Sequence, residues 1–206
     1  MASTSVGPSR FPPGHHLWFP PTALAPWHAP SMPPTLVTPR LVLTPLEDRD
    51  LVPLHAHWND PQVARHLWDA NPVALQTVAE VIARSTRTFQ TSGWGVWSLR
   101  LAEEPPLIGV CGLTPFEHGE GVELLYSLTP AHWGQGLGTE AATAVLTHAF
   151  DTLTLPEVLA TTDDANTPSI RLLTRLGATP APIVQVGPNT YPCFTIRPRY
   201  APSRPL

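Results

Sequence analysis

Lysine is absent from this chain of 206 residues, and all 12 basic residues are arginine. The arginines form no cluster, and the formal net charge is −4. A protein that binds nucleic acid through phosphate contacts needs a concentrated basic surface. A Walker A phosphate loop is excluded as well, because it requires the sequence Gly-Lys-Ser/Thr. We therefore expect no nucleic acid among the partners.

Cysteine is scarce too, since the chain has only Cys111 and Cys193. Two cysteines are too few for a disulfide framework, so we expect reduced thiols in a cytoplasmic protein. No apolar run reaches the roughly 18 residues of a membrane span, and no secretory signal pattern is visible. The 9 histidines include no HExxH or comparable spacing, so we expect neither a membrane partner nor a metal.

Proline is abundant, with 27 residues, and it is densest near the start of the chain. Residues 1–34 are predicted to be a proline-rich N-terminal extension, because proline interrupts helices and sheet ladders. Its aromatic residues suggest that part of it packs on the domain or on a second subunit; they are Phe11, Trp18, Phe19 and Trp27. Residues 35–197 are predicted to form one domain, followed by a C-terminal tail over 198–206.

Three glycines alternate with other residues in the stretch 130–142, which reads PAHWGQGLGTEAA. The segment before it is rich in β-formers, and the segment after it has apolar residues at helical spacing. Gly134, Gly136 and Gly138 therefore lie between a strand and a helix. Glycine lets a ligand approach the backbone, and a helix N-terminus attracts anions. This pattern predicts a phosphate or pyrophosphate site, with a plain turn or a Rossmann loop as alternatives.

Hydrophobic periodicity predicts the other elements. Strands are expected at 36–45, 94–101, 107–114, 121–128, 157–162, 183–186 and 191–196. Helices are expected at 48–58, with Asp48 as the cap, and at 61–67, 71–90, 139–150 and 168–176. Because a helix separates the fourth strand from the fifth, these two strands are predicted to be parallel.

The glycine tract resembles the acetyl-CoA signature of the GNAT N-acetyltransferases, Gln/Arg-x-x-Gly-x-Gly/Ala. Trp133 stands at the first position in place of Gln or Arg. A second tract, from Asn166 to Gly177, is similar to the family pattern Asn-x-x-Ser/Ala-x-x-Leu-Tyr-x-x-Leu-Gly. The phrases WGQGLGTEA and WNDPQVARHL resemble segments of the RimJ/RimL-like branch, the ribosomal-protein N-terminal acetyltransferases. The resemblance extends over about residues 35–196.

The resemblance implies an α/β (α+β) GNAT fold. Its sheet would be mixed and mostly antiparallel, with six or seven strands splayed between the fourth and fifth, and with about four flanking helices. The implied function is transfer of an acetyl group from acetyl-CoA, as cosubstrate, to a primary amine of a protein N-terminus or a small molecule. A homodimer is a common assembly. A non-catalytic acyl-CoA-binding or interaction protein and a nucleotide-binding regulator remain as alternatives.

The resemblance also assigns roles in cofactor binding. The loop amides would bind the pyrophosphate, the end of the fourth strand would pair with the pantetheine arm, and Asn166 would contact that arm. The residues assigned in this way are Tyr126, Ser127, Leu128, Trp133, Gly134, Gln135, Gly136, Leu137, Gly138, Thr139, Asn166 and Ser169.

Acetyl transfer also needs a base for the ammonium proton and a proton for the leaving thiolate. Many family members carry a tyrosine as the acid where this chain has Leu173, which leaves Ser169 or solvent as the donor. Glu123 is the best-placed carboxylate for the base, although it could instead be an exposed strand residue paired with an arginine. Tyr126 alternates to the opposite face of the strand and could simply belong to the core.

Other residues remain open for these roles. A water relay or a residue of the turn before the fourth strand could supply the base; the candidates there are Glu117, His118 and Glu120. Four tryptophans could line an acceptor pocket or pack in the core: Trp58, Trp68, Trp94 and Trp97.

Overall fold

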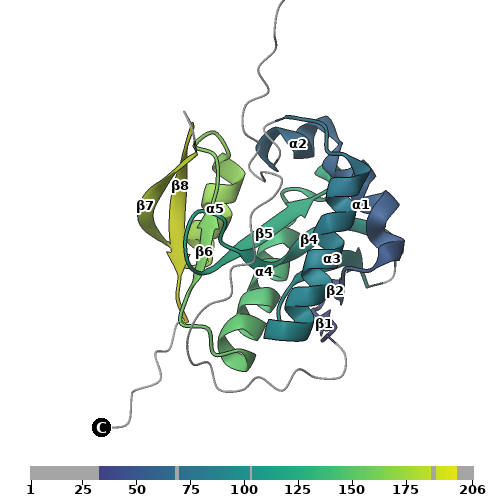
Figure 1. Ribbon diagram of the computed structural model, residues 1–206, viewed down its shortest axis with the longest axis horizontal. Coiled ribbons are helices and arrows are strands. Elements are labelled where there is room, and N and C mark those ends of the chain that lie inside the picture. The colour runs from purple at the N-terminus through teal and green to yellow at the C-terminus, as the bar shows by residue number, and fades with distance from the viewer. Residues whose placement is uncertain (1–32, 68–69, 103, 187–188, 199–206) are drawn as a thin grey trace, which may run out of the picture.

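The computed structural model describes residues 33–67, 70–102, 104–186 and 189–198, and eight strands and five α-helices lie in them (Figure 1). The strands are β1 (Leu36–Val37), β2 (Leu41–Pro45), β3 (Val96–Leu101), β4 (Glu104–Pro115), β5 (Val122–Leu128), β6 (Val158–Thr161), β7 (Thr179–Val186) and β8 (Asn189–Ile196). The helices are α1 (Leu51–Trp58), α2 (Pro61–Leu67), α3 (Leu75–Ser92), α4 (Leu137–Thr147) and α5 (Thr167–Arg175).

The strands form one sheet in the order β1-β2-β3-β4-β5-β6-β8-β7. All neighbouring pairs are antiparallel except β5 and β6, which are parallel as predicted. β4 and β5 pair along seven positions, whereas β5 and β6 share only the register pair Glu123–Leu159. The expected mixed, mostly antiparallel sheet is therefore confirmed, and it opens between the predicted fourth and fifth strands.

The predicted first strand, 36–45, is two strands rather than one. β1 and β2 pair antiparallel, with Leu36 opposite Leu43. Pro39 lies in the turn between them, where the Thr38 N–H donates to the Leu41 carbonyl. The two strands share one alternation of apolar residues, so periodicity alone could not separate them. This division is one reason why the sheet has more strands than the expected six or seven.

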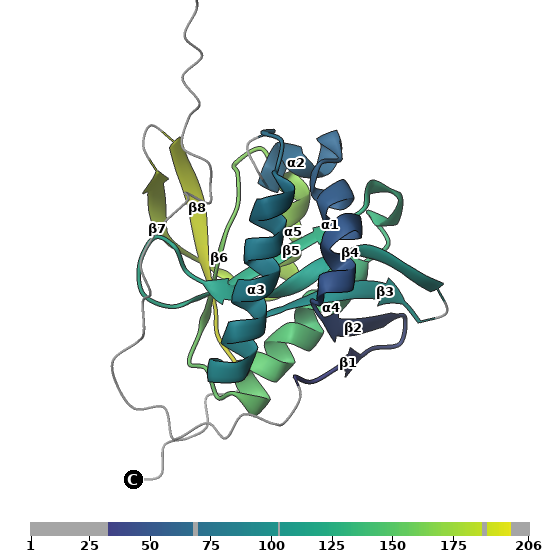
Figure 2. The ribbon, with the colours of Figure 1, turned by 45° about the vertical axis from the view of Figure 1, so that its right-hand side comes forward.

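The helices cover both faces of the sheet. α1 and α3 lie side by side on one face and pack, with α2, against Val96, Val110 and Leu125 (Figure 2). α4 packs on the opposite face, in a core that includes Trp97 and Leu124. Leu124 and Leu125 are neighbours on β5, so this strand contributes to both cores and separates two layers of helices.

Three helix boundaries differ from the predicted ones: the starts of α1 and α3 and the end of α4. A 3₁₀ turn over Asp48–Asp50 precedes α1, and its N-cap is Glu47, whose N–H donates to the Asp50 carboxylate. The prediction that Asp48 is the cap was therefore wrong. Asp50 is fully buried and pairs with Arg100 at 2.5 Å. A π-helical turn, His148–Thr152, extends α4, and α3 begins later than predicted, at Leu75.

Some expectations concern residues outside the described ranges, namely the packing of the N-terminal aromatic residues and the role of Trp68. Cys111 and Cys193 are both buried, unbridged thiols. Within the part of the chain that the structure describes, none of the helices is long and apolar enough to cross a bilayer. In the same residues, no group of three His, Cys, Asp or Glu side chains could hold a metal ion.

Candidate active site

The glycine loop connects β5 to α4, as the sequence predicted. Gly134 and Gly136 have φ angles of 73° and 79°, a left-handed conformation that favours glycine. Gly136 is the N-cap of α4. Gly138 has a different reason to be glycine, because an added Cβ would lie 3.0 Å from a methyl group of Leu172 on α5. Two glycines therefore shape the loop, and the third allows the two helices to pack closely.

A clamp from the β1–β2 turn holds this loop in place. The Arg40 guanidinium donates to the Gln135 carbonyl at 2.9 Å and forms an ion pair of 2.6 Å with Glu140. The Thr38 hydroxyl donates to the same carboxylate at 2.6 Å. Burial alone would raise the pKa of Glu140, but the hydrogen bonds from Thr38 and Arg40 lower it below its usual value. The carboxylate therefore stays ionised and keeps the loop fixed to β1–β2.

Trp133 lies on the surface of the loop, with 46% of its area exposed. Its indole N–H donates to the Leu128 carbonyl at 2.6 Å. The side chain that replaces the family's Gln or Arg therefore connects the loop to the last residue of β5. Among the other loop residues, Gln135 is exposed and donates to the Ala131 carbonyl, whereas Leu137 is buried.

Glu123 lies where β5 and β6 pair, and it is partly buried. Its carboxylate accepts hydrogen bonds from both the N–H of Thr161, at 3.0 Å, and the Thr161 hydroxyl. Both donors lie on β6, so the side chain bridges the two strands next to their single register pair. This environment differs from that of an exposed strand residue, which was the alternative for Glu123.

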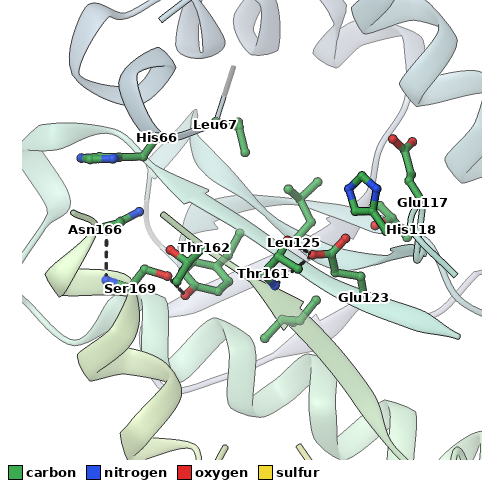
Figure 3. A pocket seen from close by; sticks show the side chains of 13 residues that line it. His66, Leu67, Glu117, His118, Glu123, Leu125, Thr161, Thr162, Asn166 and Ser169 are labelled. Atoms are coloured by element: carbon green, nitrogen blue, oxygen red, sulfur yellow. Dashed lines mark hydrogen bonds between the residues drawn. The ribbon is translucent and has the colours of Figure 1, made fainter. Parts of the chain in front are cut away.

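A cleft of about 610 Å³, which includes its solvent-open mouth, lies at this opening of the sheet. Figure 3 shows Asn166 and Ser169 toward one end of the cleft, and Glu117, His118 and Glu123 toward the other. Tyr126 also lines it. Of the base candidates in the preceding turn, Glu117 and His118 line the cleft, whereas Glu120 is exposed and does not.

Ser169 forms hydrogen bonds through both its backbone and its side chain. Its N–H donates to the Asn166 side chain at 3.2 Å, which confirms Asn166 as the cap of α5 (Figure 3). Its hydroxyl lies 2.6 Å from the hydroxyl of Tyr126. Tyr126 does pack against the core on the α4 side, but its polar end reaches the cleft. Leu173 is completely buried in that core.

Comparisons with known proteins agree with this arrangement. Residues 40–179 match the model of the acetyltransferase (GNAT) domain family. The chain belongs to the GNAT family of acetyltransferases. It is 31% identical over 144 residues to the uncharacterised N-acetyltransferase p20 of Bacillus licheniformis, a match that covers 69% of this chain and 80% of that one.

Solved structures show the same GNAT fold. An acetyltransferase of Agrobacterium tumefaciens superposes with a TM-score of 0.71 at 24% identity, over 90% of this chain and 99% of that one. RimL, a ribosomal-protein α-N-acetyltransferase solved in complex with coenzyme A, superposes with a TM-score of 0.67 at 14% identity, over 80% of this chain and 98% of that one. The fold and the enzyme class expected from the sequence are thereby confirmed.

Other expected site residues of this GNAT protein have mixed environments. The hydroxyl of Ser127 lies 2.9 Å from Nε2 of His57 on α1, and Ser127 is not among the residues that line the cleft. Burial lowers the pKa of His57 to about 4, although Asp60 raises it in part. Thr139 is partly buried in the first turn of α4. The contact of His57 with Ser127 was not predicted from the sequence, because it forms only when the fold brings α1 next to β5.

The tryptophans divide between core and cavity wall. Trp97 is fully buried and packs edge-on against Phe89, so it is a core residue. Trp58 is also buried, and it lines a small second cavity next to the cleft. Trp94 is partly buried and packs against the core on the α4 side. These three tryptophans are therefore packing residues, and none of them lines the cleft.

Proposed function

We propose that this protein transfers an acetyl group from acetyl-CoA to a primary amine in the cleft between β5 and β6. One observation carries the proposal: the cleft brings a carboxylate, Glu123, and a hydrogen-bonded hydroxyl pair, Tyr126–Ser169, to a single cavity at the sheet opening. The glycine loop follows β5 directly, so a bound cofactor can extend from the loop into the cleft.

The cofactor would bind along β5 and the loop. The amides of residues 134–139 lie at the N-terminus of α4, where unpaired N–H groups and the helix dipole favour a pyrophosphate. The left-handed glycines and the exposed surface of the loop suit close approach of such an anion. The register between β5 and β6 consists of the pair Glu123–Leu159, so the later part of β5 at Tyr126, Ser127 and Leu128 is the proposed place for the pantetheine amides to pair. Asn166 would contact the same arm.

Glu123 is the proposed base. The ammonium form of the acceptor must lose a proton before its nitrogen attacks the thioester carbonyl carbon. The Glu123 carboxylate accepts that proton directly or through a water molecule, and Thr161 holds it in position. His118 lies toward the same end of the cleft in Figure 3, and a base at this residue is the competing assignment.

Ser169 is the proposed donor to the thiolate released when the C–S bond breaks. An aliphatic hydroxyl is a weak acid, whereas the phenol of tyrosine ordinarily has a pKa of about 10. Because Tyr126 is hydrogen-bonded to Ser169, the proton given to sulfur can be replaced from Tyr126. In this scheme a phenol on β5 takes the part that the family usually gives to a tyrosine at the position of Leu173.

A thermal-shift titration with acetyl-CoA, CoA, ATP and NAD tests the cofactor, followed by thiol release with a panel of amines. A ligand at about 100 times its dissociation constant adds about 2.7 kcal/mol to stability, which is visible as a raised midpoint. We expect a shift with acetyl-CoA and CoA only. A shift without thiol release from any amine would favour a non-catalytic acyl-CoA-binding protein. Stabilisation by ATP or NAD alone would contradict the proposal.

A further inference from the structure

A histidine of the cleft wall, His66, connects α2 to the loop that follows β6. It lies in the last turn of α2, and its Nδ1 is 3.1 Å from a carboxylate oxygen of Asp163. An ionised carboxylate only accepts hydrogen bonds, so Nδ1 is the donor. The two side chains are 26% and 22% exposed, so water and salt weaken this bond only in part. Figure 3 shows His66 toward the same end of the cleft as Asn166 and Ser169.

A chain of hydrogen bonds continues from Asp163 to the hydroxyl pair of the cleft. The Asp163 carbonyl accepts from the Asn166 N–H at 3.0 Å, which closes a four-residue turn. The Asn166 side chain accepts from the Ser169 N–H at 3.2 Å. The Ser169 hydroxyl in turn lies 2.6 Å from the Tyr126 hydroxyl. The position of the Ser169 hydroxyl therefore depends in part on the bond between His66 and Asp163.

Backbone pairing holds Ser169 against β5 only weakly, because β5 and β6 share a single register pair. Ser169 lies on α5, which follows β6, whereas Tyr126 lies on β5. A separation of about 1 Å would carry their 2.6 Å contact past hydrogen-bond distance. His66 belongs to the β5 side, because α2 packs in the same core as Leu125. Its bond to Asp163 joins the two sides and opposes that separation.

We propose that His66 is a positioning residue for acetyl transfer. Through Asp163 it fixes the turn before α5, and it thereby keeps the Ser169 hydroxyl against Tyr126. When the C–S bond breaks, the sulfur takes the Ser169 proton and Tyr126 replaces it, so His66 itself gives up no proton. This inference rests on the proposed function, since it gives Ser169 the role of donor.

Two substitutions separate the hydrogen bond of His66 from its ring. His66→Phe keeps a planar ring and removes the donor, whereas His66→Asn removes the ring and keeps an N–H donor near the place of Nδ1. We expect His66→Phe to lower kcat by about tenfold, and His66→Asn to recover most of that loss. The KM for acetyl-CoA should change little, because the glycine loop is not part of this chain of bonds.

The other end of the bond and a matched histidine complete the set. Asp163→Ala removes the acceptor and should lower kcat as His66→Phe does, so the test does not depend on one variant. His55→Phe is the control, because His55 is a partly exposed histidine of α1 that lines neither the cleft nor the second cavity. Its kcat should stay at the wild-type value. A thermal melt of each variant checks that the fold is retained.

A double variant tests whether His66 acts through Ser169. In a Ser169→Ala background, His66→Phe should cause little further loss of kcat, because the hydroxyl that it positions is already absent. A loss that multiplies with that of Ser169→Ala would show that His66 acts on another group, and it would overturn the inference.

Amide hydrogen exchange of the full chain gives a measurement that needs no turnover. The amides of residues 162–169 should exchange about tenfold faster in His66→Phe than in the wild type, and His66→Asn should return them toward the wild-type rate. Unchanged exchange and kcat in His66→Phe would overturn this inference alone. No turnover of any amine by the wild type, together with no stabilisation by acetyl-CoA, would overturn the proposed function and the role of His66 with it.

Discussion

The hydroxyl oxygens of Tyr126 and Ser169 lie 2.6 Å apart, although one belongs to β5 and the other to α5. The two elements meet because β5 and β6 diverge and α5 begins just beyond β6. This pair is the most specific chemical feature of the cleft, since it places a phenol against the serine expected to serve the thiolate.

Replacing Tyr126 with Phe should lower kcat by about tenfold or more, because the phenol supplies the proton that Ser169 passes on. The KM for acetyl-CoA should change little, since the ring is kept. Steady-state kinetics separate the two constants. Ser169→Ala and the double variant should lose similar amounts of activity, because residues that act as a unit are not additive. Losses that multiply in the double variant would contradict a relay.

Tyr191→Phe is the matched control for this substitution. Tyr191 lies on β8, is nearly buried and lines neither cavity, so loss of its hydroxyl tests for a general effect on the fold. We expect its kcat to stay at the wild-type value. A fall equal to that of Tyr126→Phe would assign the effect to stability.

Glu123→Gln should reduce kcat by about 100-fold, because an amide cannot take the ammonium proton. The fold should be retained, since the amide oxygen can still accept the hydrogen bonds from Thr161. Kinetics and a thermal melt check both points, with Glu120→Gln as the exposed control. If His118→Asn has the larger effect and Glu123→Gln keeps its activity, the base is His118.

Stability should fall in mild acid because of His57. Burial lowers its pKa in the folded state to about 4, whereas an unfolded histidine has a pKa near 6.5. Between these values the unfolded chain binds the proton and the folded chain does not, so stability is lost as the pH falls from about 6.5 toward 4. From pH 7 to pH 5 the loss is roughly 2 kcal/mol. Urea denaturation at the two pH values measures it.

The variant His57→Gln isolates this contribution from that of the other histidines. Glutamine can still bond to Ser127 but does not titrate, so the variant should lose less stability between pH 7 and pH 5 than the wild type. An identical loss in both proteins would show that another group is responsible.

Arg40→Gln should weaken cofactor binding by about tenfold, because the guanidinium holds both the Gln135 carbonyl and Glu140 next to the glycine loop. The KM for the amine should be little affected, since Arg40 lies away from the cleft. Titration calorimetry with CoA checks the affinity. Arg171→Gln is the control, as an exposed arginine on α5 with no part in the clamp. Unchanged CoA affinity in Arg40→Gln would mean that the loop holds its shape without the clamp.

Local patterns in the sequence predicted the features that local chemistry determines. The glycine loop, the parallel pair β5–β6 and the Asn166 cap follow from spacing, glycine conformation and capping preference. Glu123 and Ser169 were predicted in part through the family resemblance. Both line the cleft in the structure, and their catalytic roles remain predictions.

Contacts between distant segments could not be predicted in the same way. Alternation placed Tyr126 and Glu123 on opposite faces of β5. Both line one cleft in the structure, because β5 and β6 separate beyond their single register pair at Glu123. The ion pair of Arg84 with Glu117 depends on how α3 packs across the sheet. Such contacts follow from the tertiary arrangement rather than from any spacing along the chain.

The single register pair between β5 and β6 also bears on how a ligand enters. Strands β1 to β5 form one antiparallel block, and β6 to β8 form another. Backbone pairing at the seam between these blocks is limited to one register pair, whereas every other boundary between neighbouring strands has at least two such pairs. The cleft therefore lies along the boundary of the sheet that has the least backbone pairing, where a ligand can enter between two strands without displacing a ladder of hydrogen bonds.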